Sequence, residues 1–388
     1  MFDDITTFCQ EILKIKSFSG QEGQCIKFIA EIMKKLKYDK VWIDEYGSVI
    51  GQIKGIGKKK VMLDGHIDTV EIFSPSEWLF PPFGGEVKEN KMYGRGASDM
   101  KGGIAAMIYG AASLINQKNK LKGDIFVSVS VMEENSGEIS AKKIVDAISP
   151  DFIINGEATN LNLCIGQRGR VEFKVSVYGG EGSHSCISKN NLNVIKLAIP
   201  IIQEIDNIPK RSDFFLGEGH TELTGIASYP EPPTDLIPIA CNIFYERRLV
   251  QKEETEKRVV EEIKSAIEKA RKLFPSIKAK VIVSTSEATT YTGVKLFCKK
   301  YGPSWQFSKD EKLVIHSLKA LKEIGLNPSI TFFSGFTAAS YGAGRGIPTI
   351  IFGPGELKYA HKPNEVIRID NLIKATRGYA AIIKEILM

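Results

Sequence analysis

The fold is decided by the stretch KVMLDGHIDT, which occupies residues 60–69. Its apolar run, closed by Asp-Gly, is typical of a short buried strand in a central sheet. At the end of that strand the chain presents His66 and then Asp68. A carboxylate placed there can accept one ring N–H and make the other ring nitrogen a better metal ligand. The alternative is a histidine packed at a strand end beside an incidental aspartate.

Length and composition indicate a soluble protein of two domains. At 388 residues the chain exceeds one typical core, and its 43% hydrophobic and 25% charged residues are ordinary for a globular protein. The net charge of +6 comes with no basic tail or arginine-rich stripe, so we expect no nucleic-acid partner. With no signal-like N-terminus and no run of membrane-spanning length, we expect a cytoplasmic protein without a membrane partner.

The six cysteines are scattered and form no C-x-x-C pair. This usage is typical of a reduced cytosol, and it favours neither a disulfide framework nor a thiolate metal site.

Two further predicted strands end in acidic residues. The apolar run 125–131 is followed by Glu133 and Glu134, and the run 152–154 is followed by Glu157. Solvated glutamates at surface strand ends are the alternative. Ligand sites in open α/β sheets lie beyond the carboxyl ends of the strands, and the repetition favours such a site here.

A further acid, Asp99, stands in the glycine-rich stretch GRGASDMKGG, residues 94–103. This stretch ends a long Pro- and Gly-rich segment, 71–98, and opens an Ala-rich helix that we expect to reach about residue 117. The alternative is an ordinary aspartate cap on a helix. The flanking glycines favour a ligand role, because they let the backbone pass close to something compact.

The middle of the chain changes character. Residues 171–178 alternate apolar and polar side chains, as an antiparallel strand solvated on one side does. We predict the order β-α-β-β-α-β, a ferredoxin-like unit, in residues 167–286. This unit is inserted into an α/β domain of residues 1–166 and 287–388 with a mixed, mostly parallel central sheet.

Six strand-end and loop residues form a candidate metal centre: His66, Asp99, Glu133, Glu134, Glu157 and His361. One imidazole with two carboxylates, twice over, suits two divalent ions that share a bridging carboxylate. Nitrogen and oxygen ligands without thiolates favour zinc, with cobalt or manganese as alternatives. The remaining acid would be free to act as a base.

These motifs resemble the metallopeptidase family that contains carboxypeptidase G, aminoacylase, acetylornithine deacetylase and succinyl-diaminopimelate desuccinylase. The resemblance covers essentially the whole chain. It rests on six motifs in family order, with the insertion in the right place: Gly65 to Asp68, Gly94 to Gly103, Glu133-Glu134, Gly156-Glu157, Ser183-His184-Ser185, and Gly353-Pro354-Gly355 to His361. It implies a zinc-peptidase-like catalytic domain and an inserted lid and dimerisation domain.

The resemblance also implies roles for the metal-site residues. Asp99 would bridge the two ions, His66 and Glu157 would complete one site, and Glu134 and His361 would complete the other. A cis peptide bond is implied between Asp99 and Met100.

Three more roles follow from the resemblance. Glu133 would be the general base and Asp68 the partner of His66. His184 matches a lid histidine that reaches the active site of the other subunit in dimeric relatives; the alternative is a turn histidine.

Substrate contacts are implied at Arg248, Thr337 and Asp235. Arg248 matches a lid arginine that binds a substrate carboxylate; the alternative is a solvated charge on an edge strand. Asp235 stands where many relatives have Asn, and Ala338 follows Thr337 where many have Asp. Both departures lie where the acidic end of the substrate would bind, so the identity of the substrate stays open.

We therefore predict a homodimeric, metal-dependent amidohydrolase that cleaves a small N-acyl amino acid, of the acetylornithine deacetylase or succinyl-diaminopimelate desuccinylase type. A metal-bridging water would attack the amide while Glu133 accepts its proton. A di- or tripeptide metallopeptidase is the alternative within the family. A non-catalytic descendant that binds metal or amino acids is the alternative from another class.

Overall fold

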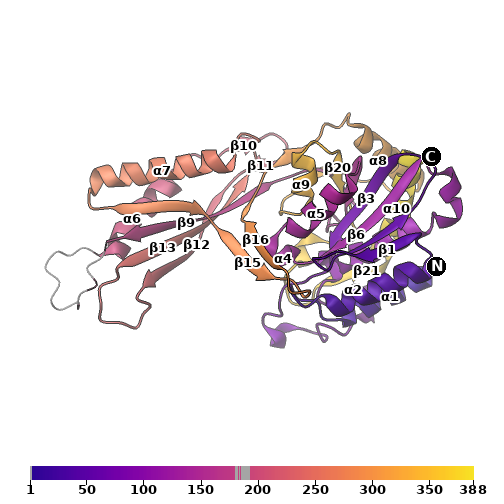
Figure 1. Ribbon diagram of the computed structural model, residues 1–388, viewed down its shortest axis with the longest axis horizontal. Helices are drawn as coiled ribbons and strands as arrows, with labels where there is room; N and C mark the ends of the chain where they lie inside the picture. Colours follow the sequence, from indigo (N-terminus) through magenta and orange to yellow (C-terminus); the bar gives the residue numbers. More distant parts are fainter. Residues whose placement is uncertain (1, 180–181, 183, 185–192) are drawn as a thin grey trace. The chain divides into compact units, whose positions relative to one another are not determined.

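The computed structural model describes residues 2–179, 182, 184 and 193–388. The chain forms two compact units, with elements labelled in Figure 1. Unit 1 comprises Met1–Gln167, Ser286–Cys298 and Gln306–Met388, and unit 2 comprises Arg168–Thr285 and Lys299–Trp305. The sequence did not predict that the chain enters unit 2 again at Lys299–Trp305. It does so because β17 (Tyr301–Gly302) pairs with β9 (Gly169–Tyr178).

Unit 1 is built on a mixed sheet with nine strands over the described residues. Strand β3 (Lys59–His66) lies at its centre, parallel to both β6 (Gly123–Ser130) and β7 (Phe152–Asn155). The last six residues of β3 are buried, as its apolar sequence predicts. The other strands are β1 (Lys40–Ile43), β2 (Val49–Ile53), β8 (Leu163–Gln167), β18 (Trp305–Gln306), β19 (Ile330–Phe333) and β20 (Thr349–Ile351), and the order is β1-β2-β6-β3-β7-β20-β8-β18, with β19 beside β8.

Helices cover this sheet. Helix α3 (Gly102–Ala112) is buried along its whole length against the strands, α1 (Phe2–Lys14) and α10 (Ile369–Leu387). An apolar cluster on the sheet includes Met62, Phe126 and residues of α5 (Ile139–Ile148). The remaining helices are α2 (Gly23–Lys35), α4 (Glu133–Ser136), α8 (Lys312–Glu323) and α9 (Ala339–Gly344).

The long segment 71–98 is more ordered than its composition suggests. It contains the hairpin of β4 (Glu86–Lys88) and β5 (Lys91–Tyr93), and β5 also pairs with β21 (Val366–Arg368). The turn residues Glu89 and Asn90 both have positive φ, at 50° and 60°, the conformation that a type I′ hairpin turn requires. This small sheet ties the glycine-rich loop to the C-terminal part of the chain.

A second hairpin in unit 1 joins β15 (Thr285–Thr289) to β16 (Lys295–Lys299). Its tip residue Tyr291 donates a hydrogen bond to the Gly47 carbonyl at 2.9 Å. A Cβ at Gly47 would lie 2.3 Å from the Tyr291 ring, so only glycine fits beneath it.

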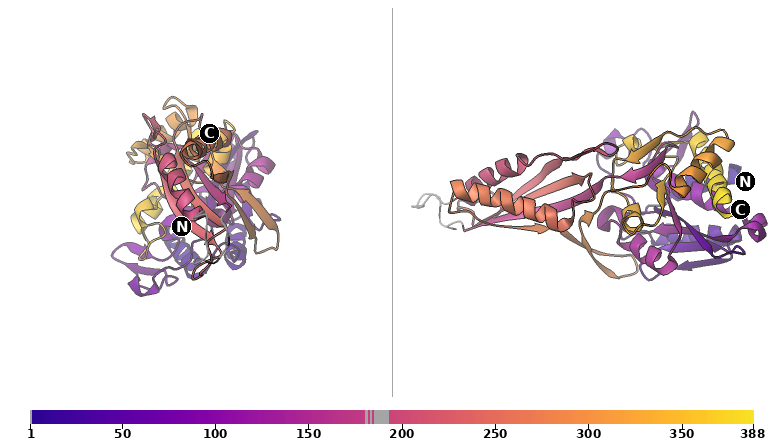
Figure 2. Two further views of the ribbon diagram at one scale, coloured as in Figure 1. Left: turned by 90° about the vertical axis from the view of Figure 1, so that its left-hand side faces the viewer. Right: turned by 90° about the horizontal axis from the view of Figure 1, so that it is seen from above.

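Unit 2 has an antiparallel sheet of order β12-β13-β9-β14, with β12 (Thr221–Tyr229), β13 (Ala240–Leu249) and β14 (Lys278–Val283). Helices α6 (Val194–Asp206) and α7 (Glu256–Leu273) lie on one face of this sheet (Figure 2) and share its apolar core. The short strands β10 (Ser212–Asp213) and β11 (Gly217–Glu218) form a separate pair. Leaving that pair aside, the order along the chain is the predicted β-α-β-β-α-β.

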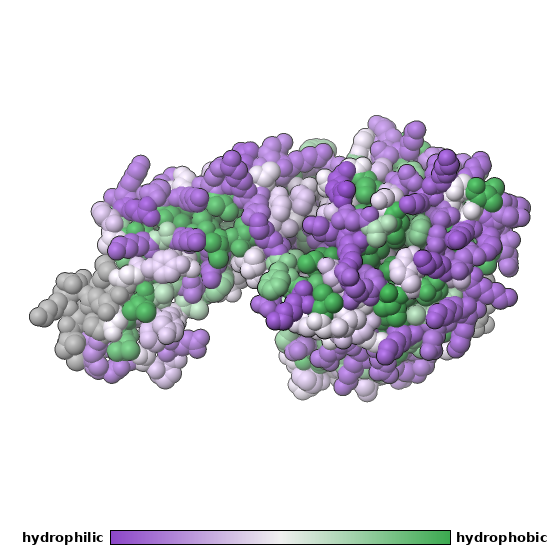
Figure 3. Space-filling model, in the orientation of Figure 1, coloured by the Kyte–Doolittle hydropathy of each residue, from purple (hydrophilic) through white to green (hydrophobic). Residues whose placement is uncertain are grey.

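Figure 3 shows hydrophilic residues spread over the visible face of both units, with hydrophobic residues between them in smaller groups. Within the described part of the chain, none of the helices is long and apolar enough to span a bilayer.

Candidate metal centre

Three parallel strands deliver polar residues to one edge of the unit 1 sheet. His66 is the last residue of β3, Glu133 opens α4 shortly after β6, and Glu157 follows β7. Because β6, β3 and β7 are neighbours and parallel, their carboxyl ends meet at this edge.

Asp99 comes from the irregular turn η2 (Ala97–Lys101), directly before α3. The peptide bond between Asp99 and Met100 is cis, so this prediction is confirmed. The start of α3, directly after this turn, packs tightly against the end of β7: a Cβ at Gly103 would lie 2.3 Å from the Gly156 carbonyl oxygen. The glycines around Asp99 thus allow the close approach that their pattern indicated.

The two histidines face the two oxygens of Asp99. The distance from His66 Nε2 to Asp99 Oδ1 is 3.2 Å, and that from His361 Nε2 to Asp99 Oδ2 is also 3.2 Å. Glu157 Oε1 lies 3.3 Å from His66 Nε2, and Glu134 Oε1 lies 2.9 Å from His361 Nε2. The structure thus brings the five predicted ligands together as two groups that share Asp99.

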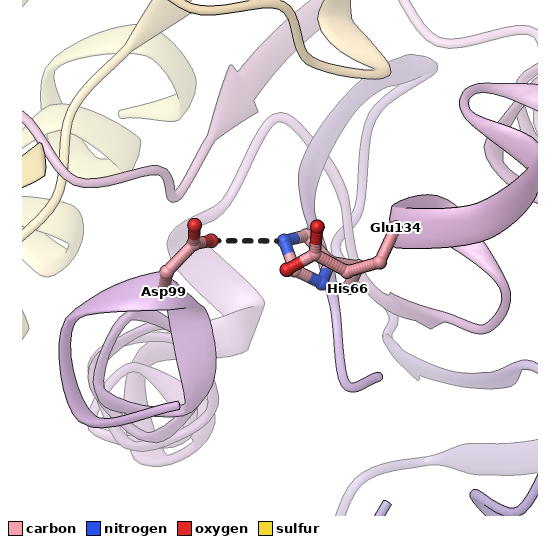
Figure 4. A group of neighbouring side chains, drawn as sticks. All are labelled: His66, Asp99 and Glu134. Atoms are coloured by element: carbon pink, nitrogen blue, oxygen red, sulfur yellow. Dashed lines mark hydrogen bonds and ion pairs between the residues drawn. The ribbon is translucent and has the colours of Figure 1, made fainter. Parts of the chain in front are cut away.

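Figure 4 shows His66, Asp99 and Glu134 pointing toward one another from three different elements. One ligand atom of each lies within 4.8 Å of the others, the arrangement expected of residues that can hold one ion.

The electrostatics of this cluster are dominated by crowded carboxylates. Burial comes first in raising the pKa of Glu133, Glu134 and Glu157, and carboxylate neighbours raise each of them further. Burial also opposes the charged form of Asp99, but hydrogen bonds from His361 and His66 outweigh it and lower its pKa.

The pKa of both imidazoles is raised. Hydrogen bonds to Asp99 and Glu134 raise the pKa of His361 to about 10. Burial opposes the charged form of His66, yet hydrogen bonds to acidic neighbours raise its pKa well above the ordinary value.

Asp68 holds other residues of the cluster in position. Its side chain is fully buried and accepts hydrogen bonds from the backbone N–H groups of Glu133 and Glu134, both at 3.0 Å, and from the Ser19 hydroxyl at 2.7 Å. His66 Nδ1 lies 2.9 Å from the Asp68 backbone oxygen and 3.6 Å from its carboxylate. Asp68 therefore orients the ring through its main chain and holds α4 with its carboxylate.

Other supporting residues were missed from the sequence. Asp64 is buried two residues before His66 and is bonded to Ser128 and Asn155, so it joins the ends of β3, β6 and β7. Glu365, four residues after His361, accepts the backbone N–H of Asp99. The sequence signal that could have indicated both residues is their short distance along the chain from a predicted metal ligand.

The donor set fits divalent cations. Five acidic side chains gather around two imidazoles, namely Asp68, Asp99, Glu133, Glu134 and Glu157. Such an excess of buried negative charge is costly unless positive charge compensates it. Nitrogen and oxygen donors in two groups sharing one carboxylate suit two ions of the zinc type.

The predicted residues of unit 2 lie as follows. His184 Nε2 is 2.5 Å from Asp235 Oδ2, and both side chains are exposed. Arg248 Nε is 2.8 Å from Glu246 Oε1. Ser183 and Ser185, which flank His184 in its motif, lie outside the described residues. His184 and Asp235 are thus partners within one unit.

Thr337 lies in unit 1 and is buried, with 1% of its surface exposed. Its hydroxyl donates to Gln167 Oε1 at 2.8 Å and accepts from the Ala339 N–H at 3.1 Å. A substrate contact at Thr337 stays a prediction.

The sequence of this chain is similar to those of known proteins over most of its length. Residues 62–385 match the model of peptidase family M20/M25/M40. Protein YgeY of Escherichia coli (strain K12) is 31% identical over 389 residues, covering 98% of this chain and 93% of its own length. Succinyl-diaminopimelate desuccinylase of Wigglesworthia glossinidia brevipalpis is 28% identical over 407 residues, covering 99% of each chain.

A solved structure supports the fold. A dinuclear metal binding peptidase of the M20 family, protein YXEP of Bacillus subtilis, superposes with a TM-score of 0.73 at 16% identity, covering 100% of this chain and 98% of its own. The predicted family and the predicted mixed α/β fold are confirmed. The chain therefore belongs to peptidase family M20/M25/M40 and is a metallohydrolase that acts on amide or peptide bonds.

Proposed function

We propose that this protein removes the acyl group from a small N-acyl amino acid, using two divalent metal ions, zinc in the first place. The observation that carries the proposal is the pair of ligand groups that share Asp99, with Glu133 beside them. Among the relatives, the desuccinylase of Wigglesworthia glossinidia brevipalpis matches this chain over 99% of both lengths, which supports a deacylase.

His66, Glu157 and Asp99 would hold one ion, and His361, Glu134 and Asp99 the other. The bound ions would supply positive charge that lowers the pKa of a water molecule and polarises the scissile carbonyl. Asp68 would keep the ring of His66 in place through the 2.9 Å contact of its backbone oxygen.

Glu133 is the group that would move the proton. It is adjacent in sequence to Glu134, and the Asp68 carboxylate accepts the backbone N–H group of each, which holds both residues at the start of α4. Burial raises its pKa, as suits a carboxylate that accepts a proton from water and passes it to the leaving amine.

Unit 2 would contribute to substrate binding. We propose that Arg248 binds the substrate carboxylate and that His184, delivered by the second subunit of a homodimer, polarises the scissile carbonyl. Asp235, which pairs with His184, would orient its imidazole.

The test is release of free amine from a panel of N-acetylornithine, N-succinyl-diaminopimelate and simple dipeptides, each with added Zn²⁺ or Co²⁺ and again with a chelator. We expect metal-dependent hydrolysis of an N-acyl amino acid. Faster cleavage of the dipeptides would favour the peptidase alternative, which the likeness to the Bacillus subtilis peptidase supports. Metal binding without hydrolysis of any member would favour a binding protein.

A further inference from the structure

Glu365 is a buried carboxylate that lies between His361 and strand β21. Its surface exposure is 0%, and no ligand role was predicted for it. Its oxygen Oε1 accepts the backbone N–H groups of Ser98 and Asp99, each at 2.9 Å. Its oxygen Oε2 accepts the Gly96 N–H at 3.0 Å and Arg95 Nη1 at 2.7 Å.

Three of these four donors are backbone groups of the loop that carries Asp99. Gly96 has a φ of +87°, so the chain there leaves helical geometry and its N–H groups need acceptors from elsewhere. A buried N–H group without an acceptor is costly, and a charged acceptor makes the stronger bond. One carboxylate therefore holds three backbone N–H groups of the loop that leads to Asp99.

The Ser98 side chain ties the same loop to the C-terminal segment on both sides of His361. The hydroxyl donates to the Val366 carbonyl at 2.7 Å and accepts the Glu356 N–H at 3.1 Å. The Glu365 carbonyl also accepts the Gly94 N–H at 3.0 Å. The segments that carry Asp99 and His361 are thus locked to one another.

The hydrogen bonds between these two segments matter because Asp99 faces two histidines at once. Each of its oxygens lies 3.2 Å from an imidazole Nε2, so the position of the Asp99 backbone affects both distances. Arg95, with 1% of its surface exposed, lies 2.7 Å from Glu365, so this carboxylate has a charged partner of its own beside the metal ligands.

We propose that Glu365 is a positioning residue of the metal centre, which holds the Asp99 carboxylate where both ligand groups can share it. The proposal rests on the function proposed above and deepens it. A residue with this role controls the affinity of both ions, whereas a purely structural residue changes only the stability of the fold.

The test uses Glu365→Gln in the full-length chain. Metal-free protein is titrated with Zn²⁺ in competition with a chromophoric chelator, and the absorption spectrum of the Co²⁺-loaded protein reports ligand geometry. Since residues behind metal ligands typically contribute about 10–100-fold to affinity, we expect a loss of that size for both ions and an altered Co²⁺ spectrum.

Unit 2 offers a matched control. Glu254 is likewise a buried carboxylate that accepts one arginine, Arg247 Nη2 at 2.7 Å, and two backbone N–H groups, those of Val250 at 2.8 Å and Gln251 at 3.0 Å. Glu254→Gln should lower the melting temperature but leave Zn²⁺ affinity and the Co²⁺ spectrum as in the wild type. If Glu365→Gln behaves in the same way, the positioning role is overturned.

Should Glu365→Gln not fold, Glu365→Asp decides. It keeps the charge opposite Arg95 but is too short to reach all three backbone N–H groups, so it should still weaken both ions. Wild-type affinity in that variant would overturn the proposal. Because these readouts need no substrate, a wrong substrate class leaves them unchanged, whereas a wild-type chain that binds no Zn²⁺ would overturn the proposed function itself.

Discussion

Buried charge is arranged in opposite ways in the arginine–glutamate network of unit 2 and in the candidate metal centre of unit 1. In unit 2, Arg247 pairs with Glu254 at 2.7 Å and with Glu262 at 2.8 Å, and Arg211 lies beside both glutamates. Burial opposes the charged form of Glu262, but hydrogen bonds and charge from Arg247 and Arg211 outweigh it and lower its pKa.

In the candidate metal centre of unit 1, acids outnumber their basic partners. The carboxylates of Glu133, Glu134 and Glu157 are buried beside other acids, and the pKa of each is raised. A fold that only needed stability would pair these charges, as unit 2 does, or replace them by apolar side chains. Uncompensated buried charge therefore distinguishes the functional site from the structural network.

The largest expected effect is the loss of turnover in Glu133→Gln. The substitution removes the proposed proton acceptor and no ligand, so activity should fall by about 10²–10⁴-fold, the usual contribution of general acid–base catalysis. Both metal ions should remain, as measured by metal content per chain alongside the rate.

Glu134→Gln is the matched neighbour and should behave differently. It alters a group 2.9 Å from His361 Nε2, so we expect one ion per chain to bind at least about tenfold more weakly. Metal loss in Glu133→Gln together with full metal content in Glu134→Gln would reverse the two assignments.

This contrast also shows what the sequence can and cannot predict. The candidate site residues at 66, 133, 134 and 157 could be predicted because each follows an apolar run that has the composition of a buried strand. Asp99 was accessible because of its glycines. The family, the mixed sheet and the β-α-β-β-α-β order follow from the same local patterns and motif order.

The residues that support the site could not be predicted from such local patterns. Glu365 looks like an ordinary polar residue until β21 pairs with β5, across some 270 positions of the chain, and buries it. The hairpin of β15 and β16 has a largely polar sequence, and what places it is the fit of Tyr291 over Gly47. Long-range packing, not local propensity, determines both.

The next prediction tests whether unit 2, besides its stabilising network of charges, contributes His184 to catalysis. His184→Ala and Glu133→Gln chains, each expected to be inactive alone, are mixed and allowed to exchange subunits. If His184 acts in the site of its partner, then about one quarter of the sites in an equal mixture combine an intact base with an intact histidine. Recovered amine release at about that fraction is the expected result.

The control for that experiment is proof that heterodimers form, for example by differential tagging and co-purification. Heterodimers without recovered activity would mean that His184 acts within its own chain or has no catalytic role. A monomer in solution would contradict the proposed homodimer directly.

The smallest effect is expected from Glu262→Gln in the balanced network of unit 2. The folded state lowers the pKa of Glu262, so its contribution to stability is fully present above the ordinary glutamate pKa and is lost as the pH falls through the lower folded value. Because Glu262 is partly exposed, we expect a loss of about 0.5–1 kcal/mol at pH 7, seen as a lower melting temperature. At a pH below the lowered folded pKa the wild type and the variant should converge. The control is Glu261→Gln, whose partner Lys257 is 3.9 Å away and exposed; it should leave the melting temperature unchanged at both pH values. If Glu262→Gln lowers the melting temperature equally at both pH values, then Glu262 contributes packing and not charge.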